Sequence, residues 1–163
     1  MKPKKILLMG VSGSGKSLIG SLIAQRLAVP FYDGDDYHPE KNVKKMRQGI
    51  PLSDADRQGW LRTLNRLFVN NDEVVIACSA LKNEYRETLR QNNEDMIIVF
   101  LRGDFDTIWS RHKQRTDHYF NGEDMLKSQF ETLVEPTLDE AIFIDITHNA
   151  EDVVNAVMRA LQN

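Results

Sequence analysis

Residues 10–17, with the sequence GVSGSGKS, constrain the fold of this chain more than any other stretch. They match the pattern G-x-x-x-x-G-K-[ST] and lie between a short apolar run at 5–9 and a segment at 16–27 whose apolar residues have helical spacing. Glycines let successive backbone N–H groups of such a loop point inward, and the following helix presents the positive end of its dipole to the same point. A polyphosphate supplies the negative charge that this arrangement favours. The motif therefore predicts a strand, a phosphate-binding loop and a helix in succession.

The rest of the chain continues this alternation of strands and helices. Short apolar runs predict further strands at 30–33, 74–78, 96–101 and 141–145. Segments with apolar residues at helical spacing predict further helices at 53–68, 81–90, 104–114, 123–133 and 150–161. Strands separated by helices favour an α/β fold, here a five-stranded parallel sheet with helices on both faces. The 163 residues contain no linker-like stretch, so we expect a single domain over 1–163.

Composition narrows the range of partners. A net charge of -3 gives no electrostatic reason to expect nucleic acid as a ligand. The single cysteine, Cys78, cannot form an internal disulfide, which favours a reducing cytoplasm. No apolar run approaches the length that spans a membrane. We therefore expect a cytoplasmic protein with neither a nucleic-acid nor a membrane partner.

The loop also predicts a metal-dependent triphosphate site. Lys16 would neutralise β- and γ-phosphate oxygens, and Ser17 would offer its hydroxyl to Mg²⁺. A glycine-rich turn that only caps a helix would require neither side chain at its position. The nucleotide-binding residues predicted in the loop are Gly10, Ser12, Gly13, Ser14, Gly15, Lys16 and Ser17.

Two acidic residues follow the second predicted strand, in the stretch FYDGDDYHPE. Asp33 ends the strand and Asp35 follows two residues later, in a crevice beside the first loop if the sheet is doubly wound. One carboxylate can anchor Mg²⁺ through water, and the other can accept a proton from a substrate hydroxyl. Turn formation or helix N-capping is the alternative interpretation, and we favour it for Asp36.

A basic pair occurs late in the chain. Arg111 and Arg115 share one face of a predicted helix that leads into a polar segment at 116–122. Such a segment can close over bound nucleotide and bring arginine to the transferring phosphoryl group. A solvated basic face near a helix C-terminus explains the pattern equally well.

Several longer segments resemble the gluconate kinases, small P-loop kinases related to the nucleoside monophosphate kinases. The matching segments follow the loop in unbroken order and are DGDDYHPEKNVKKMRQGIPLSDADRQGWL, ACSALKNEYRETLR, RHKQRTDHYF and KSQFETLVEP. The resemblance implies transfer of the ATP γ-phosphate to the 6-hydroxyl of D-gluconate, with Mg²⁺. Related kinases are often dimers, which makes a homodimer the assembly to test.

The resemblance also implies roles for individual residues. Lys16, Asp35 and Arg115 would be catalytic, while Ser17 and Asp33 would hold the metal. Arg111 and His148 would contact the nucleotide, and a lid would extend over approximately 112–128. The gluconate-binding candidates are Asp35, His38, Arg57, Lys82, Arg86 and His118. If the resemblance is set aside, Arg57, Lys82 and Arg86 are equally well read as solvated helix positions, and His38 as a residue at a helix start.

Two other functions share parts of this pattern. A kinase such as shikimate kinase also has Asp-x-Asp after its second strand, but the third strand here ends in ACSALK, without a glycine-rich turn. A nucleotide-dependent switch would carry DxxG after a strand. Asp56 to Gly59 spell that pattern, but they begin a predicted capped helix, and no NKxD motif occurs.

Overall fold

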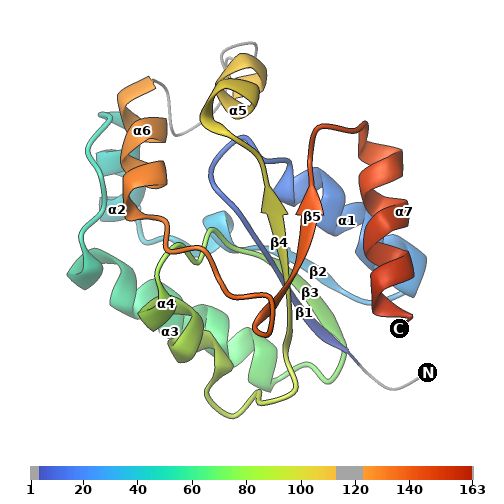
Figure 1. Ribbon diagram of the computed structural model, residues 1–163. Coiled ribbons are helices and arrows are strands. Elements are labelled where there is room, and N and C mark those ends of the chain that lie inside the picture. Colours follow the sequence, from blue (N-terminus) through green and yellow to red (C-terminus); the bar gives the residue numbers. More distant parts are fainter. Residues whose placement is uncertain (1–3, 113–122, 163) are drawn as a thin grey trace.

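The protein is described by a computed structural model that covers residues 4–112 and 123–162, apart from the side chain of His112. Its centre is a five-stranded parallel sheet in the order β2-β3-β1-β4-β5 (Figure 1). The strands are β1 Lys5–Met9, β2 Phe31–Asp33, β3 Val74–Ala77, β4 Ile97–Arg102 and β5 Ala141–Asp145. The predicted α/β fold with a parallel sheet is confirmed.

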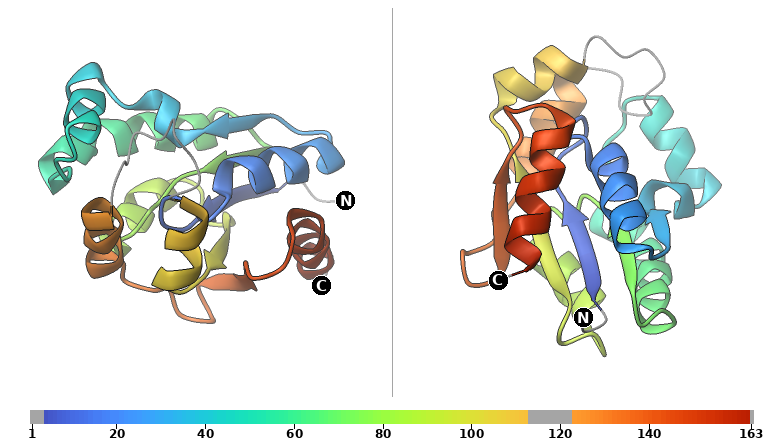
Figure 2. Two further views of the ribbon diagram at one scale, coloured as in Figure 1. Left: turned by 90° about the horizontal axis from the view of Figure 1, so that it is seen from above. Right: turned by 90° about the vertical axis from the view of Figure 1, so that its right-hand side faces the viewer.

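Helices connect the strands and cover the sheet. They are α1 Lys16–Leu27, the 3₁₀ helix η1 Gly34–Tyr37, α2 Glu40–Arg47, α3 Asp54–Val69, α4 Asn83–Arg90, α5 Phe105–His112, α6 Glu123–Thr132 and α7 Ala150–Leu161. Helices α1 and α7 lie on one face of the sheet and α3 and α4 on the other (Figures 1 and 2). Helices α5 and α6 lie beyond the carboxyl ends of the strands (Figure 1), where Phe105 and Phe130 pack edge to face.

The central strand β1 explains why the sheet is covered on both faces. Ile6 and Leu8 pack with the apolar residues of α1 and α7, whereas Leu7 and Met9 pack with those of α3 and α4. All four side chains are completely buried. Because successive side chains of a strand point to opposite faces, an uninterrupted apolar run requires a helical layer on each side.

The start of α3 follows the sequence closely. The Ser53 hydroxyl accepts a hydrogen bond from the Asp56 N–H at 3.1 Å, and the Asp56 carboxylate accepts one from the Ser53 N–H at 2.9 Å. This is a reciprocal capping box, which satisfies two N–H groups that the helix itself leaves unpaired. The cap fixes the direction of α3 and therefore the position of Arg57.

The segment after β2 differs from the prediction. Asp33, rather than Asp36, caps the helix that follows, because its carboxylate accepts the Asp35 N–H at 3.0 Å. Asp36 lies exposed within η1. Helix α2 then begins after Pro39 and buries only two residues, Asn42 and Met46.

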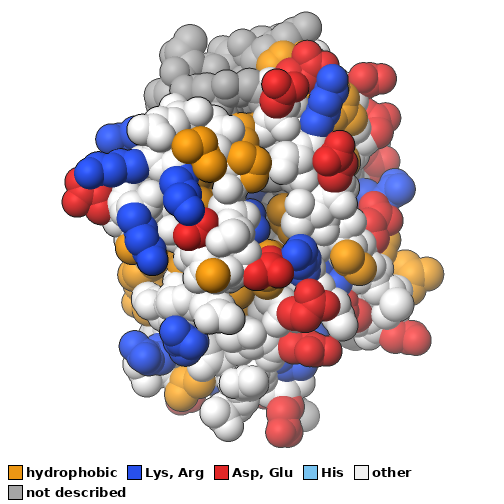
Figure 3. Space-filling view, turned by 90° about the vertical axis from the view of Figure 1, so that its left-hand side faces the viewer, with side chains coloured by type: hydrophobic (Ala, Val, Ile, Leu, Met, Phe, Trp, Pro, Cys, Tyr) orange, Lys and Arg blue, Asp and Glu red, His pale blue; other side chains and the backbone are white. Residues whose placement is uncertain are grey.

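Charges of both signs are mixed on one face of the molecule (Figure 3). Figure 3 shows one face of the protein, on which Lys and Arg side chains are interspersed with Asp and Glu side chains. Within 4–112 and 123–162, none of the helices combines the length and the apolar character that a membrane crossing requires.

Candidate active site

The loop between β1 and α1 has the backbone shape that the motif predicts. Gly13 has φ 84° and Gly15 has φ 93°, values that other residues rarely adopt. Gly15 is the N-cap of α1, and no side chain caps the helix there. The first N–H groups of α1 are therefore directed at the space above the loop, where an anion can accept from them.

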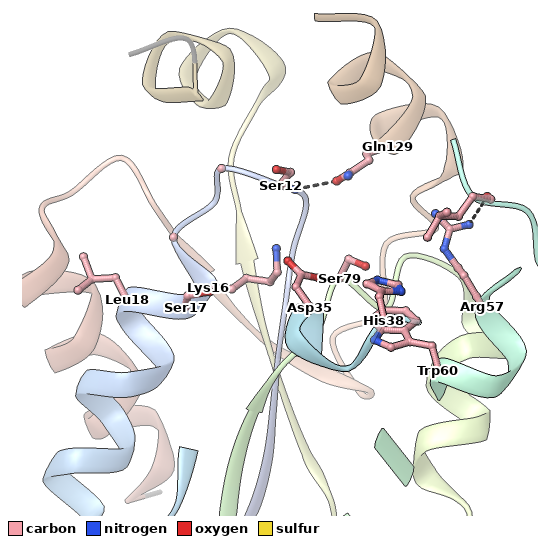
Figure 4. A pocket seen from close by; sticks show the side chains of 13 residues that line it. Ser12, Lys16, Ser17, Leu18, Asp35, His38, Arg57, Trp60, Ser79 and Gln129 are labelled. Atoms are coloured by element: carbon pink, nitrogen blue, oxygen red, sulfur yellow. Dashed lines mark hydrogen bonds between the residues drawn. The ribbon is translucent and has the colours of Figure 1, made fainter. Parts of the chain in front are cut away.

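Lys16 begins α1 and extends toward the centre of the site. Its ammonium donates to the Val11 carbonyl oxygen at 3.0 Å. Burial lowers the pKa of Lys16, and the negative charge of Asp35 acts in the opposite direction. Figure 4 shows the Lys16 and Asp35 side chains pointing toward each other below the loop.

Two carboxylates face the start of α1 from the end of β2. Asp33 accepts a hydrogen bond from the Ser17 hydroxyl at 2.5 Å and, through its other oxygen, from the Asp35 N–H. Burial raises the pKa of Asp35, while the nearby charge of Lys16 lowers it. Burial is the larger effect, so Asp35 is a stronger base than an exposed aspartate.

A pocket opens from this point, away from α1. Its lining includes Asp35, His38, Leu52, Arg57, Trp60, Ser79 and Gln129 beside the glycine loop (Figure 4). The His38 ring stacks on Trp60 with 4.0 Å between centroids and 17° between planes. Burial, together with the charge of Arg57, lowers the pKa of His38 to about 4. His38 is consequently neutral near pH 7.

Arg57 supplies positive charge on the far side of the pocket. Its Nη1 donates to the Leu52 carbonyl oxygen at 2.8 Å and to the Tyr85 hydroxyl at 3.1 Å, and the guanidinium lies 5.4 Å from the centre of the Tyr85 ring. Among the described residues that line the pocket, Lys16 and Arg57 are the cationic ones. An anionic acceptor entering here meets one cation at each end.

The structure does not bring Lys82 or Arg86 to this pocket. Lys82 pairs with Asp54 at 2.9 Å, and the Tyr85 hydroxyl donates to the same carboxylate. Arg86 is only 2% exposed and donates to Glu140 at 3.0 Å and to the Ala80 carbonyl oxygen at 2.9 Å. The interpretation of Arg86 as a solvated helix position is therefore wrong.

A second pocket lies on the other side of the glycine loop. Its lining includes Gly13, Ser14, Gly15, Arg111 and His148, together with residues at the start of α7. The hydroxyl of Ser14 is buried and has no hydrogen-bond partner among the described residues. Arg111 and His148 thus meet the phosphate-binding loop from α5 and from the segment after β5. Arg115, His118 and positions 113–122 of the predicted lid lie outside the described residues.

Five residues that line the first pocket were not predicted from the sequence as site residues, namely Leu18, Leu52, Trp60, Ser79 and Gln129. Ser79 lies two residues beyond the end of β3, and ligands bind at the carboxyl ends of parallel strands, so its position was a usable signal. Trp60 is both buried and part of the pocket wall. Gln129 on α6 accepts a hydrogen bond from the Ser12 N–H at 2.7 Å, a contact across 117 residues that no local pattern indicates.

A glycine loop with Lys16 and Ser17, carboxylates at the end of the adjacent strand and a separate polar pocket define a P-loop phosphotransferase that acts on a small acceptor. Comparison with known proteins narrows this class. The family model described as shikimate kinase matches residues 12–162. The thermosensitive gluconokinase of Escherichia coli K12 is 46% identical, with 99% of this chain and 89% of that protein covered. The thermoresistant gluconokinase of the same organism is 44% identical, with 96% and 92% covered.

Solved structures agree with this grouping. A gluconokinase from Sinorhizobium meliloti 1021 superposes with a TM-score of 0.92 at 38% identity, covering 98% of this chain and 92% of that one. A shikimate kinase from Aquifex aeolicus, with a TM-score of 0.67 at 24% identity and 97% and 96% covered, shares the fold. The chain belongs to the gluconokinase family, within the ATP-using, shikimate kinase-like P-loop kinases.

Proposed function

We propose that this protein transfers the γ-phosphate of ATP to the 6-hydroxyl of D-gluconate and releases 6-phosphogluconate and ADP. The observation that carries the proposal is the pocket beside the glycine loop, which has Asp35 near Lys16 and Arg57 on the far wall (Figure 4). Gluconate has a carboxylate at one end and a primary hydroxyl at the other. The pocket offers a cation for the first and a base for the second.

Arg57 is suited to the carboxylate end. A guanidinium presents paired N–H donors in the geometry that a carboxylate accepts. Arg57 uses Nη1 for Leu52 and Tyr85, and these contacts hold its position before the substrate arrives. We assign Arg57 to the gluconate carboxylate, and this orients the 6-hydroxyl toward the glycine loop.

Asp35 and Lys16 act at the hydroxyl end. Asp35 takes the proton of the 6-hydroxyl as that oxygen attacks phosphorus, and Lys16 offsets the negative charge that accumulates on the phosphoryl oxygens. Positioning of a general base contributes about 10²- to 10⁴-fold in rate. Lys82 and Arg86 have no part in this proposal, because their charged groups are engaged by Asp54 and Glu140.

Ser17 and Asp33 fit a Mg²⁺ ion. The hydroxyl of Ser17 and the carboxylate of Asp33 lie together at the start of α1, and Mg²⁺ typically takes one or two carboxylates together with substrate phosphates. No group of three or more metal-ligating side chains occurs in 4–112 and 123–162, so the phosphates would complete the coordination. When bound, the ion would draw charge from the phosphate oxygens.

The remaining assignments follow from the second pocket and from the family. ATP would place its adenine near Arg111 and His148, with its phosphates on residues 10–17. Arg115 and His118, in a lid over approximately 112–128, would complete the site from above. We also predict a single kinase domain over 1–163 and a homodimeric assembly. Light scattering, which measures the mass in solution, tests the dimer.

The decisive experiment is a coupled assay of ADP release with Mg-ATP. D-gluconate, shikimate and water are compared as acceptors, and we expect turnover with D-gluconate to exceed the other two by orders of magnitude. Turnover that is independent of gluconate, or none with it, would reject the assignment. Lys16→Ala and Asp35→Asn should each lower kcat by about 10²-fold or more. Asp36→Asn is the matched control for Asp35→Asn, because Asp36 is the exposed neighbouring carboxylate.

A further inference from the structure

Asn42 is a buried amide placed directly beside a residue of the acceptor pocket. It lies on α2 and is completely inaccessible to solvent. Its Nδ2 donates to the Asp56 carbonyl oxygen at 2.9 Å and lies 3.2 Å from Nδ1 of His38. Lys45, on the same helix, pairs with the Asp56 carboxylate at 2.8 Å and holds α2 against the start of α3. Asn42 therefore has a fixed position between His38 and α3.

The chemistry of its neighbours decides which way the amide points. The Asp56 carbonyl can only accept a hydrogen bond, so the Asn42 atom that faces it must be the NH₂ group. Rotating the amide by half a turn would set two oxygens against each other. The Asn42 carbonyl oxygen has no partner among the described residues, and burying it carries a cost in stability. A buried amide that carries this cost points to a specific task for its NH₂ group.

The second hydrogen of that NH₂ group is directed at His38. Nδ1 of His38 can receive it only as an acceptor, which leaves the ring proton on Nε2. A second ring proton is opposed by burial of the ring against Trp60, which removes water from the charged form, and by the charge of Arg57, and the pKa of about 4 agrees with this. Nε2 has no hydrogen-bond partner among the described residues, and His38 lines the acceptor pocket (Figure 4).

We propose that Asn42 is a positioning residue that holds His38 in the neutral Nε2–H tautomer, so that His38 offers an N–H donor to an oxygen of the sugar acid and cannot take its proton. The inference rests on the proposed function for the identity of the acceptor. Under this proposal, two side chains of the pocket have separate roles toward the substrate. His38 donates to the substrate, and Asp35 is left as the group that accepts the hydroxyl proton.

The tautomer can be measured without any substrate. Nitrogen chemical shifts of the imidazole rings distinguish the two neutral tautomers and the imidazolium, and the chain has four histidines. His38 is assigned as the signal lost in His38→Gln. At pH 7.5 we expect the Nε2–H tautomer in the unaltered protein and a mixture of tautomers in Asn42→Ser. A proton on Nδ1, or on both nitrogens, in the unaltered protein would overturn the proposal whichever acceptor the enzyme uses.

Kinetics separate positioning from general loosening of α2. Asn42→Ser should raise the KM for gluconate by about 2- to 10-fold, the worth of one hydrogen bond, with the KM for ATP little changed. Met46→Ala is the matched control, because Met46 is the other buried residue of α2. It should reduce thermal stability and leave the gluconate KM unchanged. An equal rise in the gluconate KM in both variants would overturn the assignment of Asn42.

His38 itself supplies a rescue test. The terminal amide nitrogen of glutamine reaches the position of Nε2, so His38→Gln retains a donor toward the pocket, whereas His38→Leu retains none. We expect His38→Gln to keep most of the gluconate affinity that His38→Leu loses. If the two variants lose gluconate affinity equally, His38 is not a donor and the proposal fails. A protein that shows the predicted tautomer but does not phosphorylate gluconate would instead reject the proposed function.

Discussion

Replacing Gly34 with alanine should lower the stability of this protein, whereas the same replacement at Gly59 should raise it. A Cβ atom on Gly34 would lie 2.5 Å from the Ala77 carbonyl oxygen and 3.2 Å from Cδ1 of Leu64. The Ala77 oxygen cannot retreat, because β3 is held between β1 and β2. A Cβ atom on Gly59 would meet nothing within 4 Å. One substitution therefore has opposite consequences at two sites.

The magnitudes follow from these contacts. Overpacking of a rigid interior costs about 1–3 kcal/mol, and moving Gly34 also disturbs the hydrogen bond that its carbonyl accepts from Trp60 Nε1 at 2.7 Å, worth about 1 kcal/mol. We expect Gly34→Ala to lose roughly 2–4 kcal/mol of unfolding free energy. Gly59 is exposed inside α3, where alanine is favoured over glycine by about 0.5–1 kcal/mol.

Urea unfolding of the two variants beside the unaltered protein measures both effects. Each kcal/mol also corresponds to about 2–4 °C in Tm for a chain of this size. Gly34 separates Asp33 from Asp35, so Gly34→Ala should also lower kcat in the coupled assay, while Gly59→Ala should not. If Gly34→Ala unfolds within about 0.5 kcal/mol of the unaltered protein, the contact at Ala77 is not rigid and the reasoning fails.

Three further predictions concern buried polar groups. The pKa of His38 is about 4 when folded and about 6.5 when unfolded, so the unfolded state takes up the proton first. Stability should fall as the pH drops from 6.5 toward 4, by up to about 1.4 kcal/mol per pH unit, and His38→Gln should lack this contribution in urea unfolding at pH 7 and pH 5. Arg86→Met should lower the free energy of unfolding by about 3 kcal/mol, because it leaves Glu140 unpaired, and it should leave the gluconate KM unchanged. A raised gluconate KM at near-native stability would indicate instead that Arg86 binds the substrate. Burial raises the pKa of the Cys78 thiol to about 12, so a thiol reagent should modify it only in denaturant, and reaction in buffer would contradict this burial.

The sheet and the glycine loop could be predicted because their signals are local. A strand buried on both faces must be apolar, and β3 and the part of β1 after Lys5 show that pattern directly in the sequence. Gly13, Gly15 and Lys16 stand at positions that the geometry of one loop fixes. The position of Asp33 and Asp35 follows from the rule that sites form at the carboxyl ends of strands.

Contacts between distant parts of the chain could not be predicted, because no local pattern in the sequence indicates them. Helix α2 is rich in charge and buries only Asn42 and Met46, so it has no periodic apolar face to detect. Arg86 looks like a polar position of α4, and its partner Glu140 lies 54 residues away. Gln129 likewise looks like an ordinary polar residue of an amphipathic helix, because its contact with the glycine loop exists only in the folded structure. The sequence could name Asp35 and Arg57 as candidates that the structure places in one pocket. It could not show that Lys82 and Arg86 pair with Asp54 and Glu140 instead.

The order of the pocket residues along the chain has a consequence for how such enzymes diversify. Most of the acceptor wall, including Asp35, His38, Arg57 and Trp60, comes from one continuous stretch between β2 and the first turns of α3. The second pocket, which is proposed to hold the nucleotide, is lined by the glycine loop, α5, the segment after β5 and the start of α7. Recombination that exchanges the stretch of about 34–60 would therefore replace most of the acceptor wall while keeping Ser17 and Asp33, the residues proposed to hold the metal. We expect a chimera that carries this stretch from another kinase of the same fold to shift its acceptor preference toward that kinase, with Ser79 and Gln129 still contributed by the rest of the chain.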